Sequence, residues 1–353
     1  MQTNNRRPRP PVQKQTGATL VETMVALVIG LAITSAALSS YMGNRAAFRQ
    51  IEGVARLQES ARIAASLLES DIRQAGGSVC RKNLPLSNVF NSQNWWAQPG
   101  DGIRGYESSV ADVGDSDNYA RQSGTDSITI WSANSGPITQ VRSVASAGGS
   151  TTFTVDTTAN LPLGTLAVVC DYSRAALFQV SAVSAANNTI TINTGNGTSP
   201  GNSNSDLGGG APNCANGAQT CAFGPGSLIS PLIAHHWYIS NKVATTNGSL
   251  NNLALRRNTI VYTQAGAASA SSDEILENVS DLQVTYLQGN ASMRPASSAY
   301  VGATQITNWS QVLAARMVLT LRSTDAIATG AAGAASAATY QVPVTVAIRS
   351  RLP

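Results

Sequence analysis

The sequence predicts an α+β protein in which one long N-terminal helix packs on a C-terminal antiparallel β-sheet domain with long loops. Three observations predict this class. Residues 23–42 contain no charge and are mostly apolar. Behind them, apolar residues recur at helical spacing as far as residue 72. Beyond residue 80, short runs alternate apolar and polar side chains.

The excess basic charge lies at the N-terminus. The 353 residues carry a formal net charge of +4, and only 12% of them are charged. Residues 1–17 hold no acid and four basic residues, Arg6, Arg7, Arg9 and Lys14, so the remaining 19 basic residues balance the 19 acidic ones. This asymmetry predicts a cytoplasmic N-terminus, with the bulk of the chain on the outer side of the membrane. It does not indicate nucleic-acid binding, which needs a basic cluster further along the chain.

The apolar run is long enough to cross a membrane. Twenty helical residues, at about 1.5 Å each, span about 30 Å, the thickness of a bilayer core. A secretory signal peptide or a plain anchor would also show such a run. Two features argue against these: Glu22 stands at its front, where a carboxylate is costly, and the helical pattern continues far beyond it.

The continuation reads as an amphipathic helix. Its apolar stripe covers residues 47–72, and four charge pairs at helical spacing support it: Arg49 with Glu52, Glu52 with Arg56, Glu59 with Arg62, and Glu69 with Arg73. No proline interrupts the segment before Pro85, and glycines follow Ala75. The pattern predicts one helix of about 50 residues that ends near residues 75–77.

Nine alternating runs predict the strands of the C-terminal domain. They are residues 128–131, 152–155, 166–169, 177–180, 189–192, 253–262, 282–287, 317–321 and 340–348. Pro343 in the last run favours an edge strand or a bulge, and residues 309–312 favour a short helical turn. Four low-complexity stretches, 143–150, 185–222, 265–272 and 324–338, are expected to be exposed loops.

The four cysteines, Cys80, Cys170, Cys214 and Cys221, are expected to form disulfides, because they follow a membrane-targeting segment and show no CxxC zinc pattern. Three pairings are possible. The preferred one joins Cys214 to Cys221 around a short loop rich in Gly and Asn, and leaves Cys80 with Cys170.

Other motifs give weak signals. His235 and His236 are adjacent, so on an extended chain they point opposite ways and make a poor metal pair. Asp115, Asp117, Tyr119 and Asp126 faintly resemble a calcium loop, but the glycine and the bidentate Glu are missing, so a solvated acidic loop is favoured. Trp95 and Trp96 are expected in the core rather than in a ligand-binding or subunit-contact patch. The sequence indicates no catalytic, cofactor or metal site, and no enzyme.

The N-terminus resembles that of type IV pilins and type II secretion pseudopilins. The resemblance rests on Gly17, the following Ala-Thr-Leu-Val-Glu, the apolar run and the long amphipathic helix. It implies that a prepilin peptidase cleaves between Gly17 and Ala18 and methylates Ala18. It also implies that Glu22 sets the register in a fibre by pairing with the Ala18 ammonium of a neighbour. Ala18 departs from the usual Phe or Met, and Ser39 from a helix-kinking proline of major pilins, which favours a minor pilin or a pseudopilin.

Four segments, residues 67–80, 274–288, 309–323 and 342–353, resemble PilW-type minor pilins, whereas residues 82–250 match no known pattern. The resemblance implies a cleaved leader (1–17), a transmembrane or fibre-core helix (18–43), its amphipathic continuation (44–76) and a periplasmic β-rich domain (77–353).

The implied function is pilus assembly in a priming or tip complex. The implied partners are other minor pilins, the major pilin, the prepilin peptidase, the inner membrane and a tip adhesin. The alternatives are a J-type pseudopilin of type II secretion, and an adhesin or binding module carried on a pilin stem.

Overall fold

The computed structural model describes residues 17, 19–80, 84–113, 119–133, 136–195, 197–207, 223–241, 253–263, 265–328 and 335–351. The chain divides into two compact units, Met1–Gly53 and Val54–Pro353. Helix α1 (Leu20–Gln74) begins in the first unit and ends in the second. The predicted single long helix is therefore confirmed, together with its end near residue 75.

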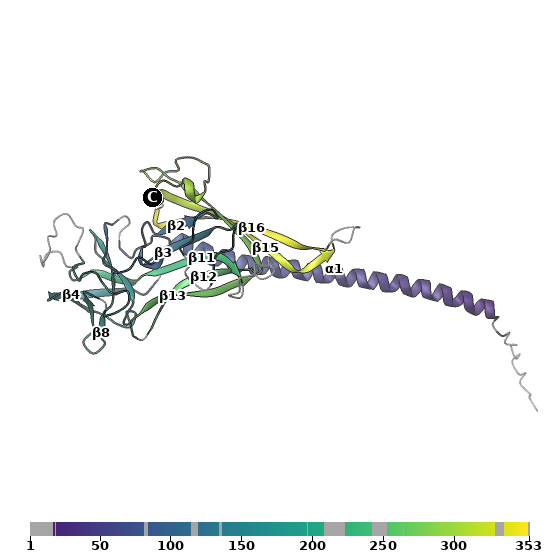
Figure 1. Ribbon diagram of the computed structural model, residues 1–353, viewed down its shortest axis with the longest axis horizontal. Helices are drawn as coiled ribbons and strands as arrows, with labels where there is room; N and C mark the ends of the chain where they lie inside the picture. Colours follow the sequence, from purple (N-terminus) through teal and green to yellow (C-terminus); the bar gives the residue numbers. More distant parts are fainter. Residues whose placement is uncertain are drawn as a thin grey trace, which may run out of the picture. The chain divides into compact units, whose positions relative to one another are not determined.

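The second unit contains three β-sheets among the described residues (Figure 1). The largest has the order β1 (Leu86–Asn88), β7 (Ala175–Gln179), β6 (Leu166–Cys170), β10 (Leu228–Pro231), β4 (Thr139–Ala147), β5 (Ser150–Val155), β9 (Thr189–Asn193), β8 (Ala182–Ser184). The second has the order β13 (Ala268–Glu277), β12 (Leu253–Tyr262), β11 (Ile233–Asn241), β3 (Ser127–Ser132), β2 (Ile103–Tyr106). The third has the order β14 (Val279–Gln288), β15 (Val312–Ala328), β16 (Ala335–Ala347).

The predicted α+β class is confirmed, because these sheets are antiparallel apart from the parallel pairing of β1 with β7. All nine predicted runs coincide with strands, although Val180 and Ile348 lie one residue beyond the ends of β7 and β16. The short turn near residue 309 is the 3₁₀ helix η5 (Trp309–Gln311), and similar turns are η1 (Trp95–Ala97), η4 (Ala303–Gln305) and η6 (Arg349–Arg351).

All four expected loops are partly wrong, since residues 185–222 contain β9 (Thr189–Asn193). Most of residues 143–150 belong to the hairpin of β4 and β5, and residues 268–272 belong to β13. Within residues 324–338, β15 extends to Ala328 and β16 begins at Ala335. Segments rich in small polar residues can still form strands here, because the backbone of the neighbouring strand supplies their hydrogen bonds.

Strand β16 lies at the edge of its sheet, as Pro343 predicted. Pro343 faces Val318 of β15 in the ladder and is exposed. The missing N–H of a proline is tolerated only where the outer side of the strand has no partner. The side chains expected on one face, from Tyr340 to Ile348, do pack against one core.

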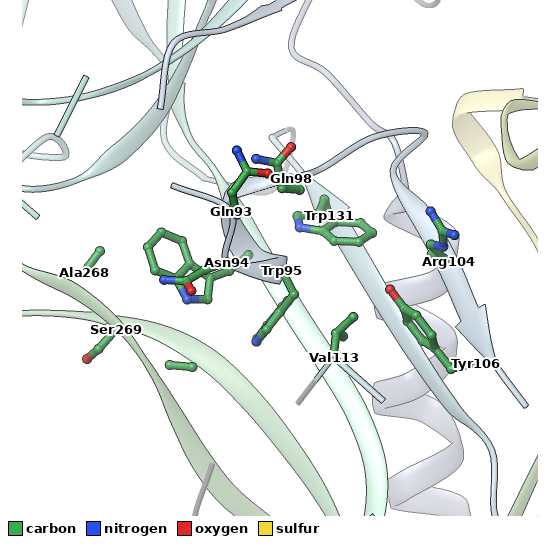
Figure 2. A pocket seen from close by; sticks show the side chains of 12 residues that line it. Gln93, Asn94, Trp95, Gln98, Arg104, Tyr106, Val113, Trp131, Ala268 and Ser269 are labelled. Atoms are coloured by element: carbon green, nitrogen blue, oxygen red, sulfur yellow. The ribbon is translucent and has the colours of Figure 1, made fainter. Parts of the chain in front are cut away.

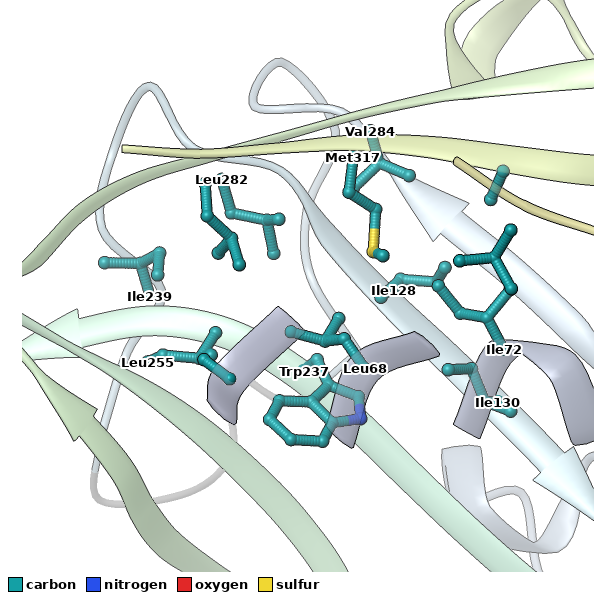
Figure 3. Packing of buried hydrophobic residues seen from close by; sticks show 14 of the residues in the cluster. Leu68, Ile72, Ile128, Ile130, Trp237, Ile239, Leu255, Leu282, Val284 and Met317 are labelled. Atoms are coloured by element: carbon teal, nitrogen blue, oxygen red, sulfur yellow. The ribbon is translucent and has the colours of Figure 1, made fainter. Parts of the chain in front are cut away.

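That core joins the end of α1 to two of the sheets. Leu68 and Ile72 are fully buried, and Figure 3 shows them beside Trp237 of β11 and Met317 of β15. The helix also contributes small residues to this core, among them Ala61 and Ala64. Alanines let the helix approach the sheets closely. The stripe predicted for residues 47–72 therefore packs against the domain, beginning at Leu57.

The C-terminal tail closes over the helix end. Gly76 and Gly102 both have positive φ, and a Cβ on Gly102 would lie 2.3 Å from the Cα of Gly76, so the two backbones touch there. Ser350 Oγ donates to the carbonyl of Ala75 at 2.7 Å. The buried Arg351 donates to the carbonyls of Val312, Trp309 and Asp101. Burial lowers the pKa of Arg351 to about 10.

We predict that Leu68→Ala lowers the free energy of unfolding by about 3 kcal/mol, because it removes a fully buried side chain and leaves a cavity. The neighbouring Leu67 is 37% exposed, so Leu67→Ala is a matched control with a loss below about 1 kcal/mol. Chemical denaturation of the full chain in detergent micelles measures both. Equal losses would contradict the packing described.

Candidate functional site

The apolar half of α1 begins with a capped turn. Thr19 Oγ1 accepts a hydrogen bond from the backbone N–H of Glu22 at 3.3 Å, and the Thr19 carbonyl accepts one from the N–H of Thr23 at 3.1 Å. This cap and the acidic side chain of Glu22 in the first turn both favour a helix start here. The carboxylate of Glu22 is exposed and has no side-chain partner among the described residues.

Of the predicted processing residues, Gly17 is exposed and nothing lies within 4 Å of the Cβ position built on it. Ala18 and the leader, residues 1–16, lie outside the described residues. Cleavage, methylation and the role of Glu22 therefore stay predictions.

The apolar side chains that follow are uncovered. Every residue from Leu20 to Gly43 for which exposure is described is exposed, including Leu27 at 66%, Leu31 at 67% and Ile33 at 63%. The helix is long and apolar enough to cross a membrane. A continuous apolar surface of this extent needs lipid or protein to cover it. The structure thus fits a single-pass membrane anchor.

The few hydroxyls in this run are satisfied by the helix itself. Thr34 Oγ1 donates to the carbonyl of Gly30 at 2.8 Å, Ser35 Oγ to that of Ala32 at 2.9 Å, and Ser39 Oγ to that of Ala36 at 2.9 Å. A hydroxyl bonded in this way has no need of water. These residues therefore fit a lipid or fibre interior although they are polar.

The helix end is tied to strand β11 by a polar contact. Asp71 Oδ2 lies 2.7 Å from His235 Nδ1 and accepts a hydrogen bond from Trp237 Nε1 at 2.8 Å. An ionised carboxylate only accepts, so Nδ1 of His235 carries its hydrogen. On the same turn of the helix, Arg73 forms an ion pair with Glu69, one of the four predicted charge pairs.

The adjacent His236 points to the other face, as expected for neighbours on a strand. Its ring is fully buried, with Nδ1 2.9 Å from Thr129 Oγ1 and Nε2 3.1 Å from Asp112 Oδ1. Arg121 Nε lies 3.6 Å from Asp112 Oδ2, and Arg121 also donates to the carbonyl of Tyr106 at 3.0 Å. The two histidines therefore serve two separate contacts.

The order Asp112, His236, Thr129 is that of a hydrolase triad. It could not be predicted, because Asp112 and Thr129 are far from His236 along the chain. Thr129 and His236 are both 0% exposed, so no substrate reaches the hydroxyl. The arrangement is a buried polar network. Burial by itself would raise the pKa of Asp112, but the hydrogen bond and charge of His236 and the charge of Arg121 outweigh it and hold the pKa below its usual value.

The remaining candidates are placed as follows. Cys80 and Cys170 form a disulfide, which is the pairing that a Cys214–Cys221 bond would leave; Cys214 and Cys221 lie outside the described residues. Asp115 and Asp117 of the faint calcium loop also lie outside them.

The other two members of that faint loop have separate contacts. Asp126 accepts backbone N–H bonds from Ser108 at 3.0 Å and Val284 at 2.9 Å. The ring of Tyr119 stacks with the guanidinium of Arg256 at 3.5 Å. Trp95 and Trp96 are buried in a core cluster, as favoured, and they also line a cavity that the sequence did not predict.

Together these features define a class: an α+β protein whose membrane-length helix carries a disulfide-linked antiparallel domain. Residues 236–348, about a third of the chain, match the family model of type IV pilus-assembly protein W, PilW. The matched segment begins within β11 and ends one residue after β16. No curated protein and no solved structure matches the chain.

The match supports a part in type IV pilus assembly, with other pilus components as partners. The resemblance noted in residues 274–288 and 309–323 falls inside the matched segment, so it is confirmed there.

We predict that Asp112→Asn lowers the free energy of unfolding at pH 7 by about 3 kcal/mol, because it breaks a buried charged network. The pKa of Asp112 is lower in the folded chain than in the unfolded one. The contribution of the Asp112 carboxylate to the free energy of unfolding is therefore complete above its pKa in the unfolded chain, about 3.9. This contribution is lost as the pH falls through its pKa in the folded chain. The variant should lack this part of the acid destabilisation in denaturant titrations between about pH 2 and pH 5.

Asp273→Asn is the matched control, because Asp273 is exposed on β13 and should leave the acid dependence unchanged. An acid dependence of Asp112→Asn equal to that of the wild type would contradict the role given to the network.

Proposed function

We propose that this chain is a minor pilin. Its leader is removed after Gly17, Ala18 becomes the methylated N-terminus, and the chain joins other minor pilins in a complex that primes the fibre and stays at its tip. One observation carries the proposal: an uncovered apolar helix of membrane length leads directly into the domain that holds the PilW match.

The uncovered helix suits a subunit that moves from lipid to fibre. In the inner membrane, lipid covers the side chains from Leu20 to Met42, with the basic leader on the cytoplasmic side. In a fibre, the apolar helices of other subunits cover the same side chains. Because lipid tails and apolar side chains are alike as surroundings, the transfer costs little for this part of the helix.

Glu22 supplies the specificity that apolar contacts lack. A carboxylate in an apolar interior costs a few kcal/mol when it has no partner. The free α-ammonium of a processed Ala18 faces the same cost. Pairing Glu22 of one subunit with Ala18 of the next removes both costs, and it does so at one axial offset only. The lack of a side-chain partner for Glu22 within the described residues leaves it available for this contact.

A clean deletion tests the proposal against the closest alternative. Surface pili and type II secretion are scored in the same strain, with the wild-type gene restored as control. We expect the loss of pili with secretion intact. Lost secretion with normal pili would identify a pseudopilin, and no change in either would leave the helix as a carrier for a binding module.

We predict that Glu22→Ala reduces the amount of the chain in sheared pili about tenfold or more, since each 1.4 kcal/mol of lost pairing is a factor of ten. Cleavage of the leader and membrane insertion should be unchanged, because the hydrogen bond to Thr19 uses the backbone of Glu22 and not its side chain. Immunoblots of sheared pili and of membranes measure the ratio.

Glu22→Asp is the matched control, since it keeps the charge and should retain most of the incorporation. Normal incorporation of Glu22→Ala would exclude the pairing role.

A further inference from the structure

A cavity of about 530 Å³ lies beside the buried network of His236. Its volume is in the range of small-molecule sites, about 300–1,000 Å³. Figure 2 shows side chains from η1, β2, β3 and β13 around it. The assembly role uses none of these residues.

The wall is aromatic and held in place. Trp95, Trp131 and Tyr106 line the cavity. The rings of Trp95 and Tyr106 lie 5.6 Å and 6.5 Å from the ring of His236, which is itself fixed by Thr129 and Asp112. Asn88 Nδ2 donates to the carbonyl of Ala97 at 2.9 Å and so fixes the short helix η1 that carries Trp95. Because these contacts already hold the aromatic side chains in place, a ligand can bind without the entropy cost of ordering them.

One buried donor in this wall has no acceptor. Trp131 is 4% exposed, and its Nε1 makes no hydrogen bond among the described residues. The nitrogen is itself buried, so Trp131 presents its apolar ring and not its N–H to the cavity.

The rim offers further polar groups. Gln93, Asn94 and Gln98 line the cavity and are exposed. The side chains of Gln93 and Asn94 make no hydrogen bond within the described part of the chain. Amide groups both donate and accept, which suits the hydroxyls of a sugar ring.

The charged group in the lining of the cavity is positive. Of the residues that line it, Arg104 is the one that carries a charge, and it is exposed with its guanidinium 6.0 Å from the ring of Tyr106. An arginine binds a carboxylate through two parallel hydrogen bonds. An acidic group on the ligand is therefore favoured over a neutral or basic one.

We propose that this cavity binds a saccharide that carries a carboxylate. The apolar C–H face of the sugar ring packs on the indole rings, the hydroxyls bond to the amides of Asn94 and Gln93, and the carboxylate pairs with Arg104. A flat aromatic ligand would use the rings but leave the amides unused, and a peptide segment would need a longer groove.

Trigalacturonic acid and its uncharged counterpart, a trisaccharide of galactose, are suitable probes. Isothermal titration of the full chain in detergent micelles measures both. We expect the acidic probe to bind with a dissociation constant on the order of 0.1–1 mM and the neutral probe at least about tenfold more weakly. Protection of tryptophan fluorescence from a soluble quencher reports whether the sugar lies on the rings.

Arg104→Met and Asn94→Ala change exposed side chains, so the fold should be retained. Arg104→Met should weaken the binding of the acidic probe about tenfold to hundredfold and leave the neutral probe unaffected. Asn94→Ala should weaken both probes about fivefold. Arg142→Met, at an exposed position of β4 outside the cavity lining, is the matched control and should change neither.

Two results would overturn the proposal: no binding of the acidic probe at about 10 mM, or binding that Arg104→Met and Asn94→Ala leave unchanged. Equal binding of both probes would overturn the assignment of a carboxylate to Arg104.

Discussion

The packing of one helical stripe against two sheets is the contact on which the rest of the structure depends. Leu57, Leu68 and Ile72 of α1 lie in a core with residues of the second and third sheets. Asp71, on the same part of the helix, accepts hydrogen bonds from β11. The polar contact fixes the rotation of the helix, because a turn of the helix by one residue would remove Asp71 from both donors. The apolar contact supplies most of the stability.

This contact also explains how one helix serves two environments. Up to Ile51 its large apolar side chains are exposed, whereas Ala61, Leu68 and Ile72 are fully buried. A helix that is covered by its own domain at one end only remains available to lipid or to other helices at the other end. Apolar side chains alone do not set an axial offset, so the proposed pairing of Glu22 with a neighbouring N-terminus is the element that makes assembly specific.

Much of the fold followed from local patterns, whereas the contacts between distant residues did not. The helix was predicted because its charge-free run and its stripe follow one period, and β16 because Pro343 and the alternation agree. Strand β11 was missed because both of its faces are covered: His235 contacts the helix and His236 lies in the buried network, so polar residues stand on both sides. Strand β13 was missed because it is rich in small and acidic residues. Its Asp273 and Glu274 lie opposite Arg257 and Arg256 of β12, a neighbour that the sequence does not identify.

The same distinction holds for the candidate sites. Gly17, Ala18 and Glu22 could be proposed from the sequence because they form a short linear motif. Asp112, Arg104 and Trp131 belong to three separate segments and meet only through the sheet order, so no spacing indicates the buried network or the cavity.

The central claim is that the chain is processed and built into a fibre, and the mass of its N-terminal peptide in sheared pili tests this most directly. The account predicts a peptide that begins at Ala18 and carries one methyl group, in a pilus fraction where the chain is a minor component. A chain found only in the inner membrane, with residues 1–17 still attached, would contradict it.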